Sequence, residues 1–277
     1  MPELPEVHVV ANHLKKLMVG RRILSAELLR PRLAPDTTPD DFDLRLAGGS
    51  IQDVGRRGKH ILVYLNNRNT LIVHLGMTGR FMILGNCLDD PRFTHAAFLL
   101  DNGSRVVFCD QRHFGRMNIV DSEQAGAARE LAKLAPEPFS DEFSIEYFKE
   151  KLAASGMSLK EFLLDQTKVC GLGNIYAAEA MFLAKLDPRQ PARLVPKRQI
   201  AKLHKAILRV LSESIAIGES LPVDPANIGG NFYGSTSEAA WRVYGREGKK
   251  CIECESPIQR IKQAGRSTFF CAKCQHR

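Results

Sequence analysis

The 277-residue sequence has no apolar run that approaches the roughly 18 residues of a membrane-spanning helix. It also lacks a secretory signal, because acidic Glu3 and Glu6 stand among its first residues. We therefore expect an intracellular, cytoplasmic monomer without membrane contact. Internal repeats and low-complexity tracts are absent as well. The hydrophobic fraction of 44% and the charged fraction of 25% argue against disorder and suit a chain that buries a core.

Acidic residues are the minority among the charged side chains, with 31 Asp and Glu against 39 Lys and Arg and a net charge of +8. This excess suits a polyanionic partner, either a nucleic acid or an acidic membrane surface. Many basic proteins bind neither, so the charge alone does not decide the function.

The first part of the chain predicts a mostly antiparallel β domain that begins with a helix. Pro5 suits a first helical turn, and apolar residues then recur at helical spacing as far as a stop signal at Gly20. Apolar β-type runs follow, and Asp101-Asn-Gly103 between two of them indicates a hairpin. The predicted strands are 61–65, 71–75, 97–100 and 105–108. Such a domain is a sandwich or a barrel.

The second part predicts helices. Ala135-Pro-Glu-Pro138 breaks regular structure and is the candidate linker. Apolar residues at spacings of three and four then mark helices over 144–155, 158–165, 174–185 and 197–216. A glycine-punctuated turn over 165–173 suggests a helix-turn-helix type motif, and 218–240 predicts a long loop. The expected domains are 1–134, 146–240 and 241–277, with a linker at 135–145.

The cysteines are seven, an odd number that argues against a secreted disulfide framework. Four of them form two Cys-x-x-Cys pairs, Cys251 with Cys254 and Cys271 with Cys274. Two such pairs complete a tetrahedral site without an open position, so we expect one structural Zn²⁺ rather than a catalytic zinc. A redox dithiol pair is the alternative. The isolated cysteines are interpreted as small buried apolar residues: Cys87, Cys109 and Cys170.

Residues 242–277 carry nine Lys and Arg against three Glu, most of the chain's positive excess. A zinc-held hairpin loaded with cations is suited to a phosphate backbone, and a solvated basic tail is the alternative. Arg266 lies between the cysteine pairs, so it is the best candidate for a positioned cation.

The N-terminus is a candidate reactive group. Removal of Met1 would leave Pro2 as a secondary amine, whose pKa of about 8 lies well below the value for lysine. Such an amine attacking an aldehydic or acetal carbon gives an iminium, and Glu3 beside it can transfer protons. A proline followed by glutamate is also a common helix start, so both interpretations stay open.

Five stretches, in this order, closely resemble the formamidopyrimidine-DNA glycosylase/endonuclease VIII family of base-excision repair enzymes. They are Met1-Pro-Glu-Leu-Pro-Glu-Val7, Arg57-Gly-Lys59, Leu75-Gly-Met-Thr-Gly79, Gly171-Leu-Gly-Asn-Ile-Tyr176 and Gly265-Arg-Ser-Thr-Phe-Phe-Cys271. The resemblance spans nearly the whole chain. It implies an α+β fold: an N-terminal antiparallel β-sandwich with an N-terminal helix, then a helical domain with a helix-two-turn-helix motif and a zinc-finger β-hairpin.

The resemblance also implies a bifunctional DNA glycosylase and AP lyase acting on double-stranded DNA with an oxidised base or abasic site. Pro2 would attack C1′, expel the base and form the iminium, and Glu3 would protonate the opening sugar and assist β- and δ-elimination. Lys59 on a β-hairpin and Arg266 in the finger would hold the phosphates beside the lesion. Read alone, the residues around Lys59 also fit a solvated turn.

Further positions match the family's DNA contacts. Asn174 and Tyr176 lie where the helix-two-turn-helix motif meets the backbone, and a glycine-rich turn opening a helix presents N–H groups to an anion. Lys168 is a weaker candidate in that turn. Glu6 matches a polar contact in the catalytic pocket, although a carboxylate favoured by the helix dipole explains it nearly as well.

A base inside a duplex must be flipped out before it can react, and its place must be filled. Met77, Arg112 and Phe114 match the family's gap-filling residues, although pattern alone favours core positions for Met77 and Phe114. This set implies oxidised purines, 8-oxoguanine and formamidopyrimidines, opposite cytosine.

The sequence departs from the family between Gly229 and Arg246, which looks short and predicts a smaller lid over 232–238. Base preference is therefore open, and the same lyase acting on oxidised pyrimidines or hydantoins is the close alternative. A non-enzymatic, zinc-dependent DNA-damage binder is the alternative from another class.

Overall fold

The computed structural model describes residues 1–85, 89–229 and 241–276. The chain divides into two compact units, Met1–Ala132 with Ile217–Ser235 and Lys133–Ala216 with Thr236–Arg277. Among the described residues, no helix combines the length and the apolar character required to cross a bilayer.

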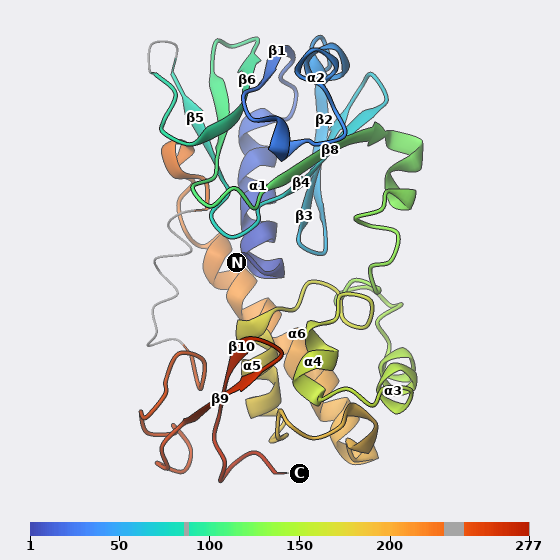
Figure 1. The fold of residues 1–277 in the computed structure, drawn as a ribbon, viewed down its shortest axis with the longest axis vertical. Coiled ribbons are helices and arrows are strands. Elements are labelled where there is room, and N and C mark those ends of the chain that lie inside the picture. The colour runs from blue at the N-terminus through green and yellow to red at the C-terminus, as the bar shows by residue number, and fades with distance from the viewer. Residues whose placement is uncertain (86–88, 230–240, 277) are drawn as a thin grey trace. The chain divides into compact units, whose positions relative to one another are not determined.

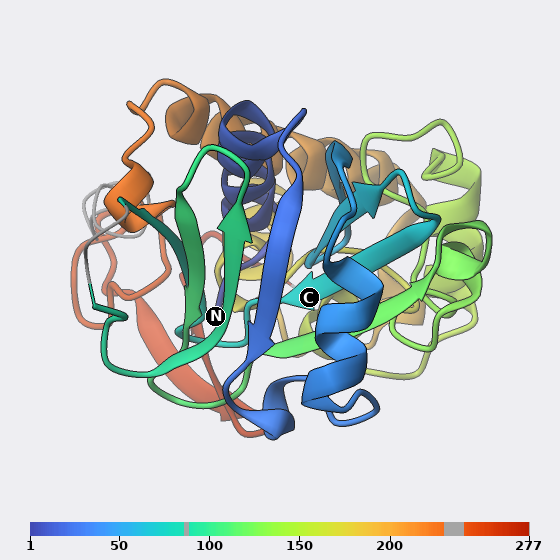
Figure 2. The same cartoon turned by 90° about the horizontal axis from the view of Figure 1, so that it is seen from above.

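Two four-stranded antiparallel sheets form most of the first unit (Figures 1 and 2). Their strand orders are β1-β6-β7-β5 and β2-β3-β4-β8. Apolar side chains of both sheets and of helix α1 (Leu4–Met18) share one buried core, which confirms the predicted β-sandwich with an N-terminal helix. The strands are β1 (Ile23–Leu28), β2 (Ile51–Arg57), β3 (His60–Leu65), β4 (Asn69–His74), β5 (Arg80–Leu84), β6 (Thr94–Leu100), β7 (Arg105–Cys109) and β8 (Arg116–Asp121).

The predicted hairpin joins β6 to β7. Gly103 adopts a φ of +81° there, and its N–H donates to the Leu100 carbonyl at 2.9 Å. The four predicted strands correspond to β3, β4, β6 and β7. The other strands of this unit and helix α2 (Pro39–Leu46) were not predicted. Polar residues interrupt the apolar pattern of most of them, and β2 buries only Ile51 and Val54, whereas β5 is a short apolar run that was missed.

The second unit contains the four predicted helices and the predicted finger hairpin. The helices are α3 (Ile145–Ala153), α4 (Leu159–Leu164), α5 (Asn174–Leu183) and α6 (Lys197–Glu219), and the hairpin strands are β9 (Gln259–Gln263) and β10 (Arg266–Phe270). Ser144 and Ser158 cap α3 and α4 through their side-chain oxygens, which explains why these helices begin there. Short 3₁₀ helices are η1 (Pro31–Leu33), η2 (Ser122–Ala127), η3 (Ala192–Leu194) and η4 (Pro225–Asn227).

The two compact units differ from the three predicted domains. The helices and the finger share one unit, and the segment that begins at Ile217, expected in the helical domain, belongs to the first unit. Ile228 shows this directly, since its N–H donates to the Phe81 carbonyl of β5 at 3.2 Å. The lid predicted over 232–238 lies outside the described residues, as does Cys87. Cys109 and Cys170 are buried as expected.

Candidate functional site

Pro2, Glu3 and Glu6 lie together at the start of α1. Glu3 is the N-cap residue, and its carboxylate accepts the N–H of Glu6. In return, the Glu3 N–H donates to Oε2 of Glu6 at 2.7 Å, which completes a capping box. Pro2 is buried, Glu3 is 3% exposed and Glu6 is 6% exposed. The helix-start and catalytic interpretations are therefore compatible, because the cap holds a carboxylate next to Pro2 in the chain.

Lys59 lies in the turn that joins β2 to β3, a β-hairpin as the family resemblance implied. Gly58 adopts a φ of +57° in this turn, and Nη1 of Arg56 donates to its carbonyl at 3.0 Å. Only 7% of Lys59 is exposed, so the solvated-turn interpretation is wrong for this side chain. Helix α1 packs against both strands of this hairpin.

Two histidines that the sequence analysis did not single out follow this turn. The rings of His60 and His74 lie 5.0 Å apart. Burial, together with nearby His60, Lys59 and Arg116, lowers the pKa of His74 to about 4. A neutral His74 accepts at Nδ1, and the N–H of Gly76 donates to it at 3.1 Å. His74 therefore supports the turn that carries Met77.

The three predicted gap-filling residues come from two loops, β4–β5 and β7–β8. Met77 is 41% exposed and Phe114 is 45% exposed, so neither is a core residue. The Arg112 guanidinium lies 5.2 Å from the centroid of the Phe114 ring, a cation–π distance. Gly76 has a φ of +65°, and a Cβ there would lie 2.5 Å from the carbonyl carbon of Phe114. The two loops therefore touch backbone to backbone.

Arg266 is the exposed first residue of β10, and its neighbour Ser267 is anchored from two helices. The Ser267 carbonyl accepts from Nδ2 of Asn174 at 3.0 Å and from Nζ of Lys160 at 2.6 Å. Nζ of Lys160 also donates to Oγ1 of Thr268 at 2.6 Å. Asn174 therefore contacts the residue that follows Arg266. The two residues come from separate motifs, and their contacts with DNA stay predictions.

Lys160 is a functional candidate that the sequence analysis missed. Its side chain is 1% exposed, and burial, followed by the charge of Arg266, lowers its pKa to about 8. The only sequence signal is a lysine beside Glu161 in a short helix whose other residues are apolar.

The four paired cysteines converge, with all their sulfur atoms within 4.8 Å of one another. The Sγ atoms of Cys251 and Cys274 are 3.9 Å apart, and those of Cys254 and Cys271 are 3.4 Å apart. A tetrahedral zinc with Zn–S bonds of about 2.3 Å requires sulfur separations of about 3.8 Å. The residues therefore fit one tetrahedral metal ion with four thiolate ligands.

Comparison with known proteins identifies the family to which the chain belongs. Residues 1–117 match the formamidopyrimidine-DNA glycosylase N-terminal domain, and residues 134–223 match its H2TH domain. A formamidopyrimidine-DNA glycosylase of Desulforamulus reducens is 39% identical over 276 residues, covering 99% of both chains. That of Paracoccus denitrificans is 41% identical over 286 residues, covering 99% of this chain and all of the relative. The chain belongs to the formamidopyrimidine-DNA glycosylase family.

Solved structures agree with this assignment. A Lactococcus lactis Fpg (MutM) in complex with DNA containing N7-benzyl-Fapy-dG has a TM-score of 0.91, 33% identity and full coverage of both chains. The same enzyme with abasic-site DNA also has a TM-score of 0.91, at 33% identity over 99% of this chain. The chain is thus a DNA glycosylase of the repair type.

Residues 248–277 match the zinc finger found in FPG and IleRS, and this segment contains all four converging cysteines. The chain therefore holds one structural zinc. Its four thiolates fill the coordination sphere, so the metal holds the hairpin and takes no part in a reaction.

Tyr176 lies in the buried core, whereas Lys168 is half-buried in a turn. Tyr176 is fully buried, with its hydroxyl 2.6 Å from that of Ser214 and its ring edge-on to Trp241. The Tyr176 side chain is thus part of the core, and its contact with DNA stays a prediction. Lys168 is half-buried in the turn before α5, where its carbonyl accepts from the Tyr147 hydroxyl at 3.2 Å.

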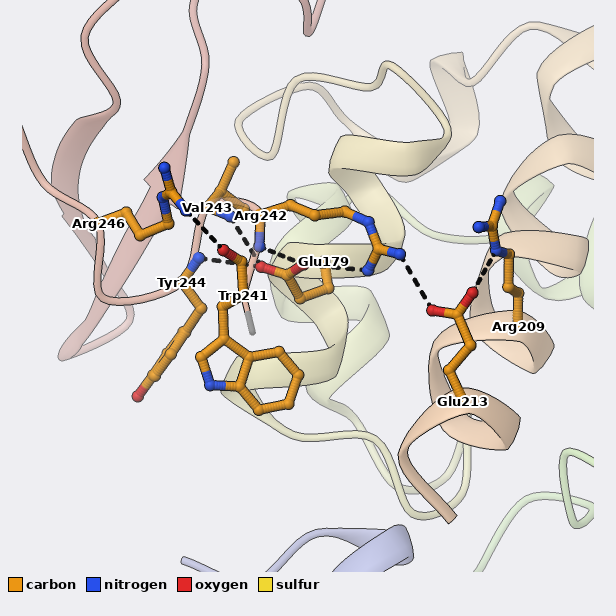
Figure 3. Close-up of polar contacts among 8 residues, drawn as sticks. All are labelled: Glu179, Arg209, Glu213, Trp241, Arg242, Val243, Tyr244 and Arg246. Carbon is orange, nitrogen blue, oxygen red and sulfur yellow. Dashed lines mark hydrogen bonds and ion pairs between the residues drawn. The ribbon is translucent and has the colours of Figure 1, made fainter. Parts of the chain in front are cut away.

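Glu179 of α5 is a buried carboxylate that the sequence analysis also missed (Figure 3). It accepts the backbone N–H groups of Arg242, Val243 and Tyr244 at 2.9, 2.9 and 3.0 Å. The Arg242 side chain then reaches Glu213 at 3.0 Å. Glu179 therefore anchors the chain to α5 where it enters the zinc finger.

Proposed function

We propose that this chain is a bifunctional DNA glycosylase and AP lyase that removes oxidised purines and cuts the strand by β- and δ-elimination. The observation that carries the proposal is the N-terminal cluster, in which Pro2 precedes a buried carboxylate fixed by a capping box. A nucleophile and a proton-transfer group in adjacent positions are what an iminium mechanism requires.

The chemistry begins with loss of Met1, which makes Pro2 a secondary amine with a pKa near 8. The nitrogen lone pair forms a bond to C1′ of the damaged nucleotide, the glycosidic bond breaks, and the base leaves with its electron pair. The proton lost by the nitrogen goes to the departing base, and the Glu3 carboxylic acid gives a proton to the ring oxygen as the sugar opens. The product is an iminium that links Pro2 to C1′.

The iminium then serves as an electron sink. Loss of a proton from C2′ expels the 3′ phosphate, and a second elimination expels the 5′ phosphate. Glu3 is suited to move these protons because it lies beside the amine that carries the sugar. Both strand breaks therefore follow from the same covalent link.

The DNA contacts are assigned by side-chain chemistry. Lys59 and Arg266 supply cations for the phosphates beside the lesion, and the side-chain amide of Asn174 joins them. Oδ1 of Asn174 is buried, and among the described residues it has no hydrogen-bond partner. Exposed Met77, Arg112 and Phe114 fill the gap left by the flipped nucleotide.

Oxidised purines opposite cytosine are the proposed substrates, with formamidopyrimidines among them. The Lactococcus relative, similar over the full chain, forms a complex with DNA that contains N7-benzyl-Fapy-dG, which supports this class. Excision from an 8-oxoguanine:cytosine duplex, compared with a matching oxidised-pyrimidine duplex, tests the preference. Faster excision of the pyrimidine would contradict it.

Borohydride trapping tests the lyase chemistry. The chain with Met1 removed should become covalently linked to abasic-site DNA under reduction. Pro2→Gly should abolish this link while salt-sensitive DNA binding remains. A chain that binds abasic DNA without any trapped product would be a damage binder and not a lyase.

A further inference from the structure

Asp110 is a buried carboxylate between the two loops that carry the gap-filling residues. It follows β7 directly and is 0% exposed. Its Oδ1 accepts the Thr78 hydroxyl at 2.5 Å and the Arg112 N–H at 3.2 Å, and its Oδ2 accepts the Gly115 N–H at 2.7 Å. One side chain thus binds both loops.

Thr78 strengthens this link. It follows Met77 in the β4–β5 loop, and its Oγ1 accepts the N–H of Arg112 from the β7–β8 loop at 3.1 Å. The same hydroxyl donates to Asp110, so the two loops are joined through a closed set of hydrogen bonds. Thr78 is next to Met77 in the chain, and the Arg112 backbone belongs to this set while its side chain is proposed to enter the duplex.

The backbone leaves little freedom around Asp110. A Cβ at Gly115 would lie 2.8 Å from the Phe108 ring and 3.2 Å from Oδ2 of Asp110. Gly79 closes the other loop by donating to the Leu75 carbonyl at 2.9 Å, and a Cβ at Gly79 would lie 2.2 Å from that oxygen. Both loops are therefore fixed close to the carboxylate.

An ionised carboxylate is the group this position requires. Burial by itself would raise the pKa of Asp110, but the hydrogen bonds from Thr78, Gly115 and Arg112 outweigh burial and lower it. Every donor points toward an oxygen of the Asp110 carboxylate. An amide at this position would therefore turn its NH₂ group toward one of these donors. A buried donor left without an acceptor is costly.

We propose that Asp110 is a positioning residue that joins the two loops into one preformed wedge, so that Met77, Arg112 and Phe114 enter the duplex together. The inference rests on the proposed function, since it takes these residues to fill the gap. Opening a base step costs a few kcal/mol. Loops ordered in advance do not add their own ordering entropy to that cost.

The test is Asp110→Asn, which keeps the side-chain shape. We place 2-aminopurine opposite a tetrahydrofuran abasic analogue, which binds but cannot form an iminium, and measure the fluorescence rise as the base is unstacked. Asp110→Asn should bind this duplex nearly as well as the native chain and lose most of the rise. Excision from a lesion duplex should fall on the order of tenfold to a hundredfold, as for lost hydrogen bonds to a charged group.

Trapping on single-stranded abasic DNA, which has no base stack to open, should stay near the native level. Asp43→Asn is the matched control, because Asp43 accepts the Ala26 N–H at 2.7 Å in the same unit and touches neither loop. A fluorescence rise in folded Asp110→Asn equal to that of the native chain would overturn the proposal. Equal losses of excision on duplex DNA and of trapping on single-stranded DNA would also overturn it.

Circular dichroism shows whether Asp110→Asn is folded. If it is not, Thr78→Val decides, because it removes the shared hydroxyl and keeps the shape; a fluorescence rise like that of the native chain would then refute the wedge. Failure of the proposed function has a different signature. In that case the native chain leaves no trapped product on single-stranded abasic DNA, whereas the fluorescence measurement still tests Asp110.

Discussion

The proposed catalytic cluster of the first unit is held by a capping box on a packed sandwich, whereas the finger of the second unit has only a small apolar cluster and four converging cysteines. Glu3 and Glu6 are fixed by the helix they cap. Strand β9 has no buried residue and β10 buries only Thr268 and Phe270, so we expect the finger to depend strongly on the four cysteines that converge on one metal site. Catalysis and binding of the DNA phosphates therefore depend on different interactions, and a substitution should be able to remove one without the other.

The largest expected effect is on the chemistry alone. Glu3→Gln keeps a side-chain oxygen to accept the Glu6 N–H, so the cap survives, but it removes the proton-transfer group. Strand cleavage should fall on the order of a hundredfold to ten-thousandfold, with DNA affinity nearly unchanged. Single-turnover cleavage and equilibrium binding measure the two quantities. Glu6→Gln, on the same helical turn, should lose much less cleavage activity. Equal losses in the two variants would mean that the effect comes from the helix cap and not from proton transfer.

Loss of the metal should weaken DNA binding and leave the first unit folded. Cys271→Ser together with Cys274→Ser leaves two ligands, so the finger should unfold and DNA affinity should fall by about tenfold or more. The sandwich should keep its β-sheet circular dichroism. Cys109→Ser, a buried cysteine outside the finger, is the control. Tight DNA binding without zinc would show that the finger hairpin does not depend on its metal.

A smaller effect is expected from single finger cations. Arg266→Ala should reduce the slope of log affinity against log salt by about 0.9, the value for one lost phosphate contact on duplex DNA. Arg260→Ala is the matched control on the same hairpin, because Arg260 already pairs with Glu247 at 3.1 Å. Equal changes in slope would mean that the finger contacts DNA without a positioned cation.

The smallest effect concerns Lys160 and pH. Its pKa is about 8 in the folded chain and about 10.4 when unfolded, so between these values the unfolded chain binds more protons. The free energy of unfolding should therefore rise with pH over this range in the native chain, relative to Lys160→Met. Urea unfolding at several pH values measures the difference. Lys262→Met, on the exposed side of the hairpin, should keep the rise of the unfolding free energy with pH. Loss of the rise in Lys262→Met would contradict its assignment to Lys160.

Local patterns predicted the parts of this molecule that depend on near neighbours. Pro5 and the apolar spacing after it predicted α1, and two Cys-x-x-Cys pairs predicted the metal cluster. Each of these signals is a short spacing that repeats along the chain, so it is visible in the sequence. Strand β2, which escaped prediction, buries only Ile51 and Val54, and it packs against α1, which is remote in sequence.

The supporting residues of the site could not be predicted for the same reason. Lys160 bonds to Thr268, 108 residues away, and Glu179 bonds to Val243, 64 residues away. Asp110 and Thr78 are 32 residues apart. The exposure of Met77 and Phe114 is likewise a property of the fold, since apolar side chains in a β domain are more often buried.

The most direct test of the account is to locate the covalent link. The chain with Met1 removed is trapped on abasic-site DNA with borohydride, digested with nuclease and trypsin, and analysed by mass spectrometry. The account predicts the sugar remnant on the N-terminal peptide that begins at Pro2, on the proline nitrogen. A remnant on Lys59 or any other lysine, or no remnant in a sample with a free Pro2, would contradict it.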